Sequence, residues 1–167
     1  MHSWRITKYD PNNRSASGHY FKDEWTSISD VGKEYGDALF TLSRYIKIES
    51  LYLDSILIIM SSLGVDYLMA SDLEKRITKR HTVLTKEEMS FLKSLKNNMC
   101  VPKESIDLLA RLVLREFVWC KLVHSNMFVH FGYDYHMYIG STTPLESELE
   151  QIRASGLFVE SMPSPYC

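Results

Sequence analysis

Two stretches of aromatic and β-branched residues on either side of Ser125-Asn126 constrain the fold of this chain more than any other feature. The first stretch, 117–123, reads FVWCKLV, and the second runs from Met127 to Ile139. Residues of these types favour strands, and a short polar turn between two such stretches favours a β-hairpin. The sequence therefore predicts a long C-terminal hairpin over about 117–139, with its second stretch forming one continuous strand.

The register of this hairpin gives its two faces different compositions. A two-residue turn at 125–126 places Lys121 opposite His130. One face is then mostly apolar and is predicted to join the core: Val118, Cys120, Leu122, Met127, Val129, Phe131, Tyr133, Met137 and Ile139. The other face mixes aromatic and titratable side chains: Phe117, Trp119, Lys121, Val123, Phe128, His130, Gly132, Asp134, His136 and Tyr138. A face exposed only to solvent does not need this mixture, so partner binding is one interpretation of it.

Four helices are predicted alongside the hairpin. The clearest one runs from about Thr41 to Leu63, since apolar residues recur at helical spacing. Its predicted buried stripe consists of Leu42, Ile46, Leu53, Ile56, Met60 and Leu63. A second helix is predicted to begin after Thr85, which forms a capping box with Glu88, and to run to about 96.

The remaining elements complete an α+β fold. A third helix is predicted near Pro102, and a fourth after Thr143-Pro144-Leu145-Glu146, which has the spacing of another capping box. Short strands are predicted at 4–9, 65–70 and 157–159, while 20–31 could be a strand or a structured turn. We expect a single domain over 1–167, with an antiparallel sheet packed against about four helices.

Glu49 lies at the centre of the apolar stripe of the long helix. A buried carboxylate needs a partner or a raised pKa. Glu49 is therefore either a site residue in a cleft or a structural hydrogen-bond acceptor, with a tyrosine hydroxyl, an arginine or a backbone amide as its donor.

Charge is unevenly distributed along the chain, although the formal net charge is only −2. The net charge is −4 over 1–74, +6 over 75–121 and −4 over 122–167. The small total argues against nucleic-acid binding driven by gross charge. The basic region 75–103 leaves an RNA-binding module as an alternative, but aromatic residues that would stack on bases are nearly absent there.

Catalytic and metal-binding motifs are not recognisable in the sequence. His136 and Asp134 could form a general acid–base pair, which keeps a small enzyme as an alternative. Neither a nucleophile motif nor a phosphate-binding glycine loop accompanies them. His130 and His136 would lie too far apart on one strand to share a metal ion. We therefore expect no catalytic residue, no cofactor, no metal and no small-molecule substrate.

Cysteine usage and hydropathy indicate a cytoplasmic protein. The three cysteines, Cys100, Cys120 and Cys167, have no spacing typical of a disulfide framework. The N-terminus lacks the apolar region of a signal peptide, and no apolar run approaches the length of a membrane span.

Four segments carry a resemblance to a known group of proteins. They are WRITKYDP at 4–11, DEWTSISDVG at 23–32, HFGYDY at 130–135 and SGLFVE at 155–160. With these segments, nearly the whole chain resembles small bacterial cytoplasmic immunity partners of polymorphic toxins. It is similar in particular to immunity proteins of contact-dependent growth inhibition systems, such as those paired with EndoU-type RNase toxins.

The resemblance implies a non-enzymatic antitoxin that binds one toxin domain and blocks its active site. A nuclease presents a basic substrate cleft, which an acidic surface with aromatic anchors would complement. The residues that we expect to contact the toxin are Asp23, Glu24, Trp25, Asp30, Glu34 and Asp37. A second candidate surface comprises Trp119, His130, Asp134 and His136. No contact with membrane or nucleic acid is expected.

Overall fold

The computed structural model describes residues 1–76 and 84–166. In these ranges the chain forms four α-helices and a seven-stranded antiparallel sheet, as expected for the α+β class. The helices are α1 (Leu42–Ser62), α2 (Lys86–Ser94), α3 (Ile106–Leu114) and α4 (Glu146–Ala154). The strands of the large sheet, in spatial order, are β5 (Met99–Pro102), β4 (Tyr67–Lys75), β6 (Val118–Val123), β7 (Met127–Phe131), β8 (Met137–Ser141), β1 (His2–Thr7) and β9 (Phe158–Ser161). A separate hairpin pairs β2 (Glu34–Tyr35) with β3 (Ala38–Leu39).

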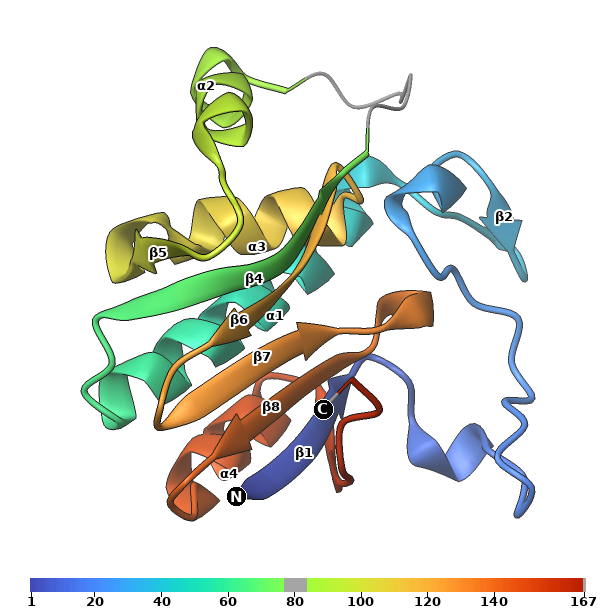
Figure 1. Ribbon diagram of the computed structural model, residues 1–167. Coiled ribbons are helices and arrows are strands. Elements are labelled where there is room, and N and C mark those ends of the chain that lie inside the picture. The colour runs from blue at the N-terminus through green and yellow to red at the C-terminus, as the bar shows by residue number, and fades with distance from the viewer. Residues whose placement is uncertain (77–83, 167) are drawn as a thin grey trace.

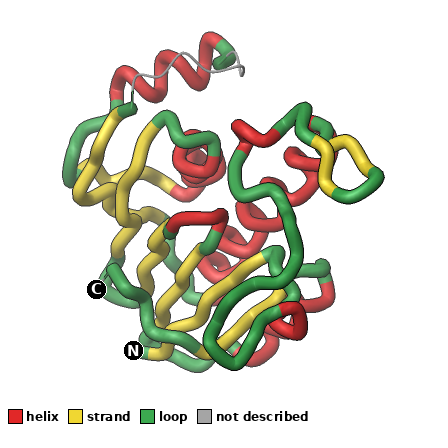
Figure 2. Tube along the Cα trace, turned by 90° about the vertical axis from the view of Figure 1, so that its right-hand side faces the viewer, coloured by secondary structure: helices red, strands yellow, loops and turns green. Residues whose placement is uncertain are grey.

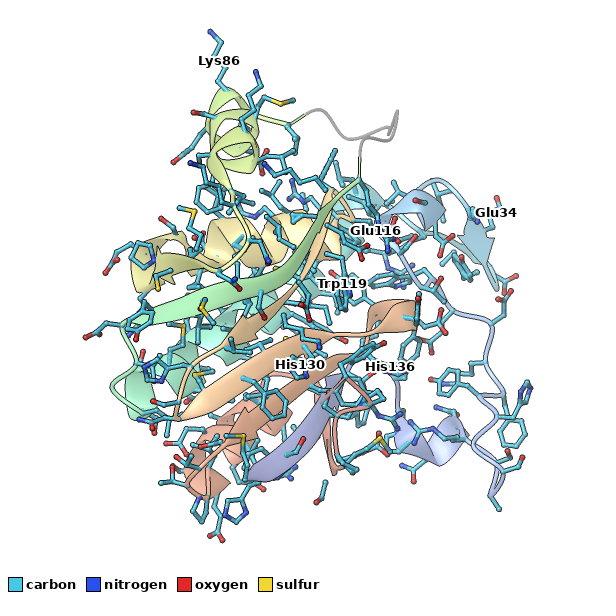
Figure 3. All side chains as sticks on the ribbon, viewed as in Figure 1. Glu34, Lys86, Glu116, Trp119, His130 and His136 are labelled. Carbon is cyan, nitrogen blue, oxygen red and sulfur yellow. The ribbon has the colours of Figure 1, made fainter. Side chains whose placement is uncertain are left out.

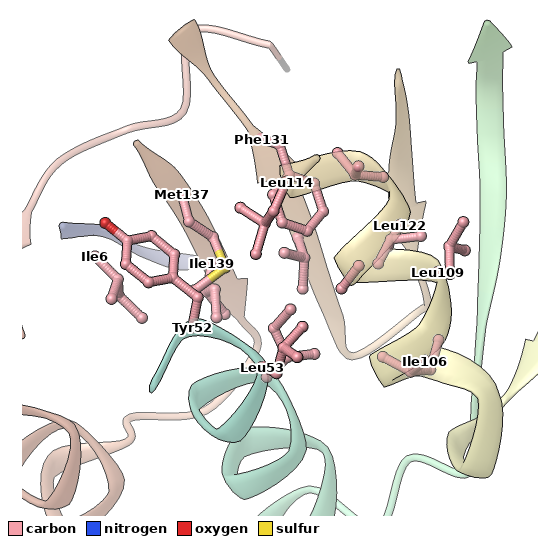
Figure 4. Packing of buried hydrophobic residues seen from close by; sticks show 14 of the residues in the cluster. Ile6, Tyr52, Leu53, Ile106, Leu109, Leu114, Leu122, Phe131, Met137 and Ile139 are labelled. Carbon is pink, nitrogen blue, oxygen red and sulfur yellow. The ribbon is translucent and has the colours of Figure 1, made fainter. Parts of the chain in front are cut away.

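The helices α1, α3 and α4 lie on one face of the large sheet, whereas α2 lies apart at one end (Figure 1). The core forms between these helices and the sheet. In Figure 4, Leu53 of α1 and Leu109 of α3 approach Leu122, Phe131 and Ile139 of the strands. Burying an aliphatic or aromatic side chain of this kind contributes about 1.5–3 kcal/mol. This layer fixes the positions of the strand ends that carry the candidate site.

The predicted C-terminal hairpin is confirmed in β6 and β7, where Lys121 lies opposite His130. The prediction of one continuous strand from Met127 to Ile139 is wrong, because β7 ends at Phe131. The chain turns back through the 3₁₀ helix η4 (Tyr133–Tyr135), and β8 then pairs with β7 in antiparallel orientation.

The hydrophobic pattern of the sequence does not reveal the turn between β7 and β8. Phe131 and Met137 lie opposite each other and both are buried, so odd-numbered residues face the core on both strands. The alternation of apolar residues therefore passes through the turn without a break. Gly132 and Asp134, residues that favour turns, are the local signals that mark it.

The predicted buried stripe of α1 is confirmed at Leu53, Ile56 and Met60 but is wrong at its N-terminal end. Leu42 and Ile46 are 44% and 42% exposed, respectively. The buried face instead runs through Tyr45, Glu49 and Tyr52, which lie at helical spacing before Ile56. Hydrophobicity alone misplaced the stripe, because each buried tyrosine hydroxyl donates a hydrogen bond to a backbone carbonyl, that of Leu114 or of Tyr135.

The two predicted capping boxes have different outcomes. The Thr85 hydroxyl accepts from the Glu88 backbone amide, and the Glu88 carboxylate accepts from the Thr85 amide, as predicted. At α4 the N-cap is Leu145, without a side-chain cap, so the predicted box at Thr143 is wrong. The Thr143 amide donates instead to the Ser141 hydroxyl.

The sequence pattern did not predict the structure of two further segments unambiguously. The strand β5 was not predicted; it pairs with β4 along the edge of the sheet. In 20–31 the structure contains no strand but the 3₁₀ helix η2 (Ile28–Asp30), so the structured turn is the correct alternative. Short elements such as these bury few residues, and their periodicity is too brief to be recognised.

Glu49 binds Arg115, one of the structural partners considered from the sequence. The two carboxylate oxygens of Glu49 accept from Nε and Nη2 of Arg115, both at 2.8 Å. Glu88 accepts from Nη1 of the same guanidinium at 3.3 Å. Glu49 and Glu88 are only 2% and 4% exposed, and Arg111 lies within 4 Å of both carboxylates. One arginine of the α3 C-terminus thereby links α1 to α2.

Replacement of Arg115 is expected to be strongly destabilising. Arg115→Met leaves two buried carboxylates without their main partner, which typically costs about 3–5 kcal/mol. The matched control is Arg153→Met, since the Arg153–Glu150 pair is exposed on α4 and such pairs contribute about 1 kcal/mol or less. Urea unfolding measures both variants, and equal losses would contradict the structural role of Arg115.

Candidate partner-binding cleft

A cleft of about 430 Å³ opens where β6 begins, where β7 ends and where η4 follows it. We call it the aromatic cleft. It is lined by side chains from distant parts of the sequence, including Glu74, Trp119, Tyr133, Asp134, His136 and Tyr166. Thr26 and Ser27 also line it, so the segment that carries the first candidate set borders the cleft, although none of the six residues of that set lines it. Figure 3 shows Trp119 and His136 near this end of the sheet.

Trp119 spans the strands at the point where they separate. The pairing of β6 with β7 ends at Lys121 and His130. Beyond it, the Trp119 indole donates from Nε1 to the Phe131 carbonyl at 3.1 Å. The ring of Tyr166 lies edge-on to the indole, with ring centroids 6.1 Å apart. These contacts hold the indole in place as one wall of the cleft.

The turn η4 exposes the side chain of Tyr133 to solvent and buries that of Tyr135. Asp134 and Tyr135 both have positive φ, 55° and 63°, a conformation that non-glycine residues seldom adopt. Tyr133 is 79% exposed, whereas Tyr135 is 6% exposed and packs edge-on against Trp25 and Tyr52. The Tyr135 carbonyl also accepts from the Tyr52 hydroxyl at 2.8 Å. The core thus stabilises a strained turn that carries an exposed ring and an exposed carboxylate.

His136 is held by β1 and not by Asp134. Its Nδ1 lies 3.1 Å from the Thr7 hydroxyl, and its ring packs 5.2 Å from that of Tyr9. Burial, together with the positive charge of Arg5, lowers the pKa of His136 to about 4. The imidazole is therefore uncharged at neutral pH, and its Nδ1 is already engaged. This geometry gives little support to an acid–base pair with Asp134.

His130 lies away from the cleft, on the sheet face opposite the helices. Its Nδ1 lies 2.8 Å from the Ser164 hydroxyl, and its ring stacks on Phe128 at 4.3 Å. Burial lowers its pKa to about 4. His130 is only 4% exposed, so of the second candidate set only Trp119, Asp134 and His136 share the cleft.

The first candidate set divides into exposed and buried residues. Asp23, Glu34 and Asp37 are exposed, and Glu24 is half-buried beside Lys8. Trp25 is only 8% exposed, so its predicted role as a surface anchor is not supported.

Trp25 and Asp30 hold the segment 20–40 in place. The Trp25 ring stacks on Phe40 with centroids 4.5 Å apart, and the Lys8 ammonium lies over the indole. Asp30 is 7% exposed; it accepts from the Thr26 amide and pairs with Lys33. The charge of Asp30 and the aromatic ring of Trp25 suggested contact with a partner. In the structure, Trp25 packs inside the protein and Asp30 caps the turn.

A second cavity of about 360 Å³ adjoins the aromatic cleft, since Thr26, Asp134 and His136 line both. Its other side carries Arg5 and Arg14. Both arginines bind the carboxylate of Glu160, at 2.6 and 2.8 Å, which offsets part of their charge. Lys22 adds a third cation against Glu24 and Asp134, so the lining of the second cavity is less acidic than that of the aromatic cleft.

The basic region spreads over β4, α2 and the segments that follow. In its described part the exposed cations are Lys75, Arg76, Lys86, Lys93 and Lys96, while Lys103 is half-buried. Lys79 and Arg80 lie outside the described residues. Among the described residues of 75–103, no aromatic side chain has a large exposed fraction, so the RNA-binding alternative gains no support from stacking surfaces there.

Comparison with protein-family models, with curated protein sequences and with solved structures found no match to this chain. In residues 1–76 and 84–166, no three His, Cys, Asp or Glu side chains gather in a way that could hold a metal ion. None of the helices described is both long and apolar enough to cross a membrane. Cys120 is fully buried, and burial raises the pKa of its thiol to about 12.

The buried histidines predict a stability that falls in mild acid. In the unfolded chain, His130 and His136 bind protons near pH 6.5. In the folded protein, the same two histidines bind protons only near pH 4. The contribution of these two histidines to the free energy of unfolding is expected to be constant above about pH 7.5 and to decrease below about pH 6.5. The slope is at most about 1.4 kcal/mol per pH unit for each histidine.

Urea unfolding between about pH 7.5 and pH 5 measures this dependence, in a range where most carboxylates stay ionised. His136→Gln should reduce the slope, whereas replacing the exposed His19 by Gln should not. An unchanged slope in His136→Gln would contradict the assignment.

Proposed function

We propose that this protein is a cytoplasmic immunity protein, which binds the nuclease domain of a cognate bacterial toxin and blocks its active site. The observation that carries the proposal is the exposed acidic segment 20–40, which borders the aromatic cleft and ends in a projecting hairpin. Charge and shape both fit a basic, concave partner site, as a nuclease substrate cleft is.

Internal ion pairs engage only two of the five carboxylates of this segment. Lys8 pairs with Glu24, and Lys33 pairs with Asp30. No residue in the described part of the chain forms an ion pair with the exposed carboxylates, which are those of Asp23, Glu34 and Asp37. Complementary exposed charge raises the association rate with a basic partner.

The hairpin of β2 and β3 gives this charge a shape that could enter a cleft. It projects from the body of the molecule on the side that faces the viewer in Figure 2. Gly36 adopts a positive φ of 61° in its turn, next to Asp37. Leu39 is 53% exposed beside these acidic residues. An apolar side chain amid carboxylates combines contact area with charge complementarity.

Co-expression tests the proposal directly. The gene immediately upstream should encode a toxin domain, and this protein should protect cells from it and form a 1:1 complex with it. Protection is measured by growth, and the complex by gel filtration and calorimetry. Absence of both protection and binding would overturn the proposed function.

Charge reversal on the hairpin should weaken the complex. Glu34→Lys replaces a complementary charge by a repulsive one, so we expect at least about a tenfold rise in Kd, mostly at low salt. Glu104→Lys is the matched control, because Glu104 is also exposed but lies in the 3₁₀ helix η3 (Lys103–Ser105), which follows β5 across the molecule (Figure 1). Equal Kd values for the two variants would exclude the hairpin from the interface.

A further inference from the structure

The aromatic cleft has walls of aromatic rings and a rim of carboxylates. Trp119, Tyr133 and Tyr166 supply the rings. Three carboxylates line the cleft, those of Glu74, Glu116 and Asp134, against a single cation, Arg76. The formal charge of its lining is therefore negative, because His136 is uncharged at neutral pH.

We infer that this cleft binds an arginine side chain projected by the protein partner. A planar guanidinium stacks on aromatic faces and donates to carboxylates at the same time, which an ammonium does less well. The inference depends on the proposed function for the identity of the partner, but its chemistry depends only on the cleft. It deepens the proposal by assigning one contact of the interface to a residue type.

The cleft is large enough to admit an inserted side chain. Its volume of about 430 Å³ lies within the range of about 300–1,000 Å³ for ligand pockets. Trp119 is fixed by its hydrogen bond to Phe131, so one stacking wall is already in place before a ligand arrives. Pre-formed walls reduce the ordering that binding would otherwise require.

Tyr133 and Asp134 are the side chains best placed to contact the ligand. Tyr133 is the most exposed of the large apolar and aromatic residues in the described ranges, at 79%. Exposed tyrosines next to a cleft are frequent energetic centres of interfaces. Asp134 is exposed beside it and forms no ion pair with another described residue, as is also true of Glu74.

Two other charged residues line the cleft, Glu116 and Arg76, and neither is expected to bind the guanidinium. Glu116 already interacts within the protein, so it is not counted as a ligand acceptor. Arg76 follows the end of β4, two residues after Glu74, and lines the same cleft, so it reduces the negative potential on that side. The guanidinium is therefore expected nearer to Asp134 than to Arg76.

The test uses Nα-acetyl-arginine amide as the probe and Nα-acetyl-citrulline amide as its neutral control of equal shape. Titration is followed by NMR at the indole Nε1–H of Trp119, whose signal is assigned with Trp119→Phe. A saturable shift is expected with the arginine derivative, with a dissociation constant in the millimolar range. The citrulline derivative should bind at least about fivefold more weakly, since it lacks the charge.

Two variants test the named contacts. Asp134→Asn keeps a residue type that tolerates positive φ but removes the charge, and it should weaken binding of the arginine probe at least about threefold. Tyr133→Ala should do the same by removing the stacking ring. Phe21→Ala is the control for loss of an exposed aromatic, because Phe21 is 67% exposed and does not line the cleft. Urea unfolding verifies that each variant is folded.

The outcomes separate this inference from the proposed function. Equal binding of the arginine and citrulline probes, no saturable shift up to about 50 mM, or unchanged binding by both Asp134→Asn and Tyr133→Ala would overturn the arginine site. Arginine binding without protection from the upstream toxin would retain the site and reject the toxin as partner. Protection that is unaffected by these two variants would retain the function and exclude the cleft from the interface.

Discussion

The arginine at the end of α3 is the interaction on which the arrangement of helices depends. Arg115 binds two buried carboxylates from two other helices, Glu49 and Glu88. Desolvating these groups is costly, and only their close geometry offsets the cost. Arg115 is the C-cap of α3, and the chain enters β6 three residues later, at Val118. The ion pair therefore lies next to the start of the strand that carries Trp119, one wall of the aromatic cleft.

Much of the architecture could be predicted because it depends on local patterns. The facing positions of Lys121 and His130 followed from a two-residue turn, and the cap of α2 followed from Thr85 and Glu88. The unusual position of Glu49 in an apolar stripe correctly indicated a buried polar contact. The identity of its partner was not determined, because Arg115 lies 66 residues away and no local pattern connects the two.

The candidate site was less predictable, since it is assembled from segments that are far apart in sequence. Trp119 and Asp134 were identified as one surface, but the strand predicted through 132–136 would have placed them on a flat sheet. The turn at η4 turns that surface into the rim of a cleft, and it also exposes Tyr133, which was assigned to the core. Burial of Trp25 was missed for a different reason: composition indicates what an aromatic residue can do, but not which side of a loop it occupies.

The backbone of η4 also has a consequence for how this surface can vary. Exposed positions usually accept many residue types, because few atoms surround them. At Asp134 and Tyr135 the left-handed conformation penalises β-branched side chains in particular, and the buried ring of Tyr135 must still fill its place beside Tyr52. Under the proposed function, the hairpin of β2 and β3 would therefore accept more substitutions in response to a changing partner than this turn would.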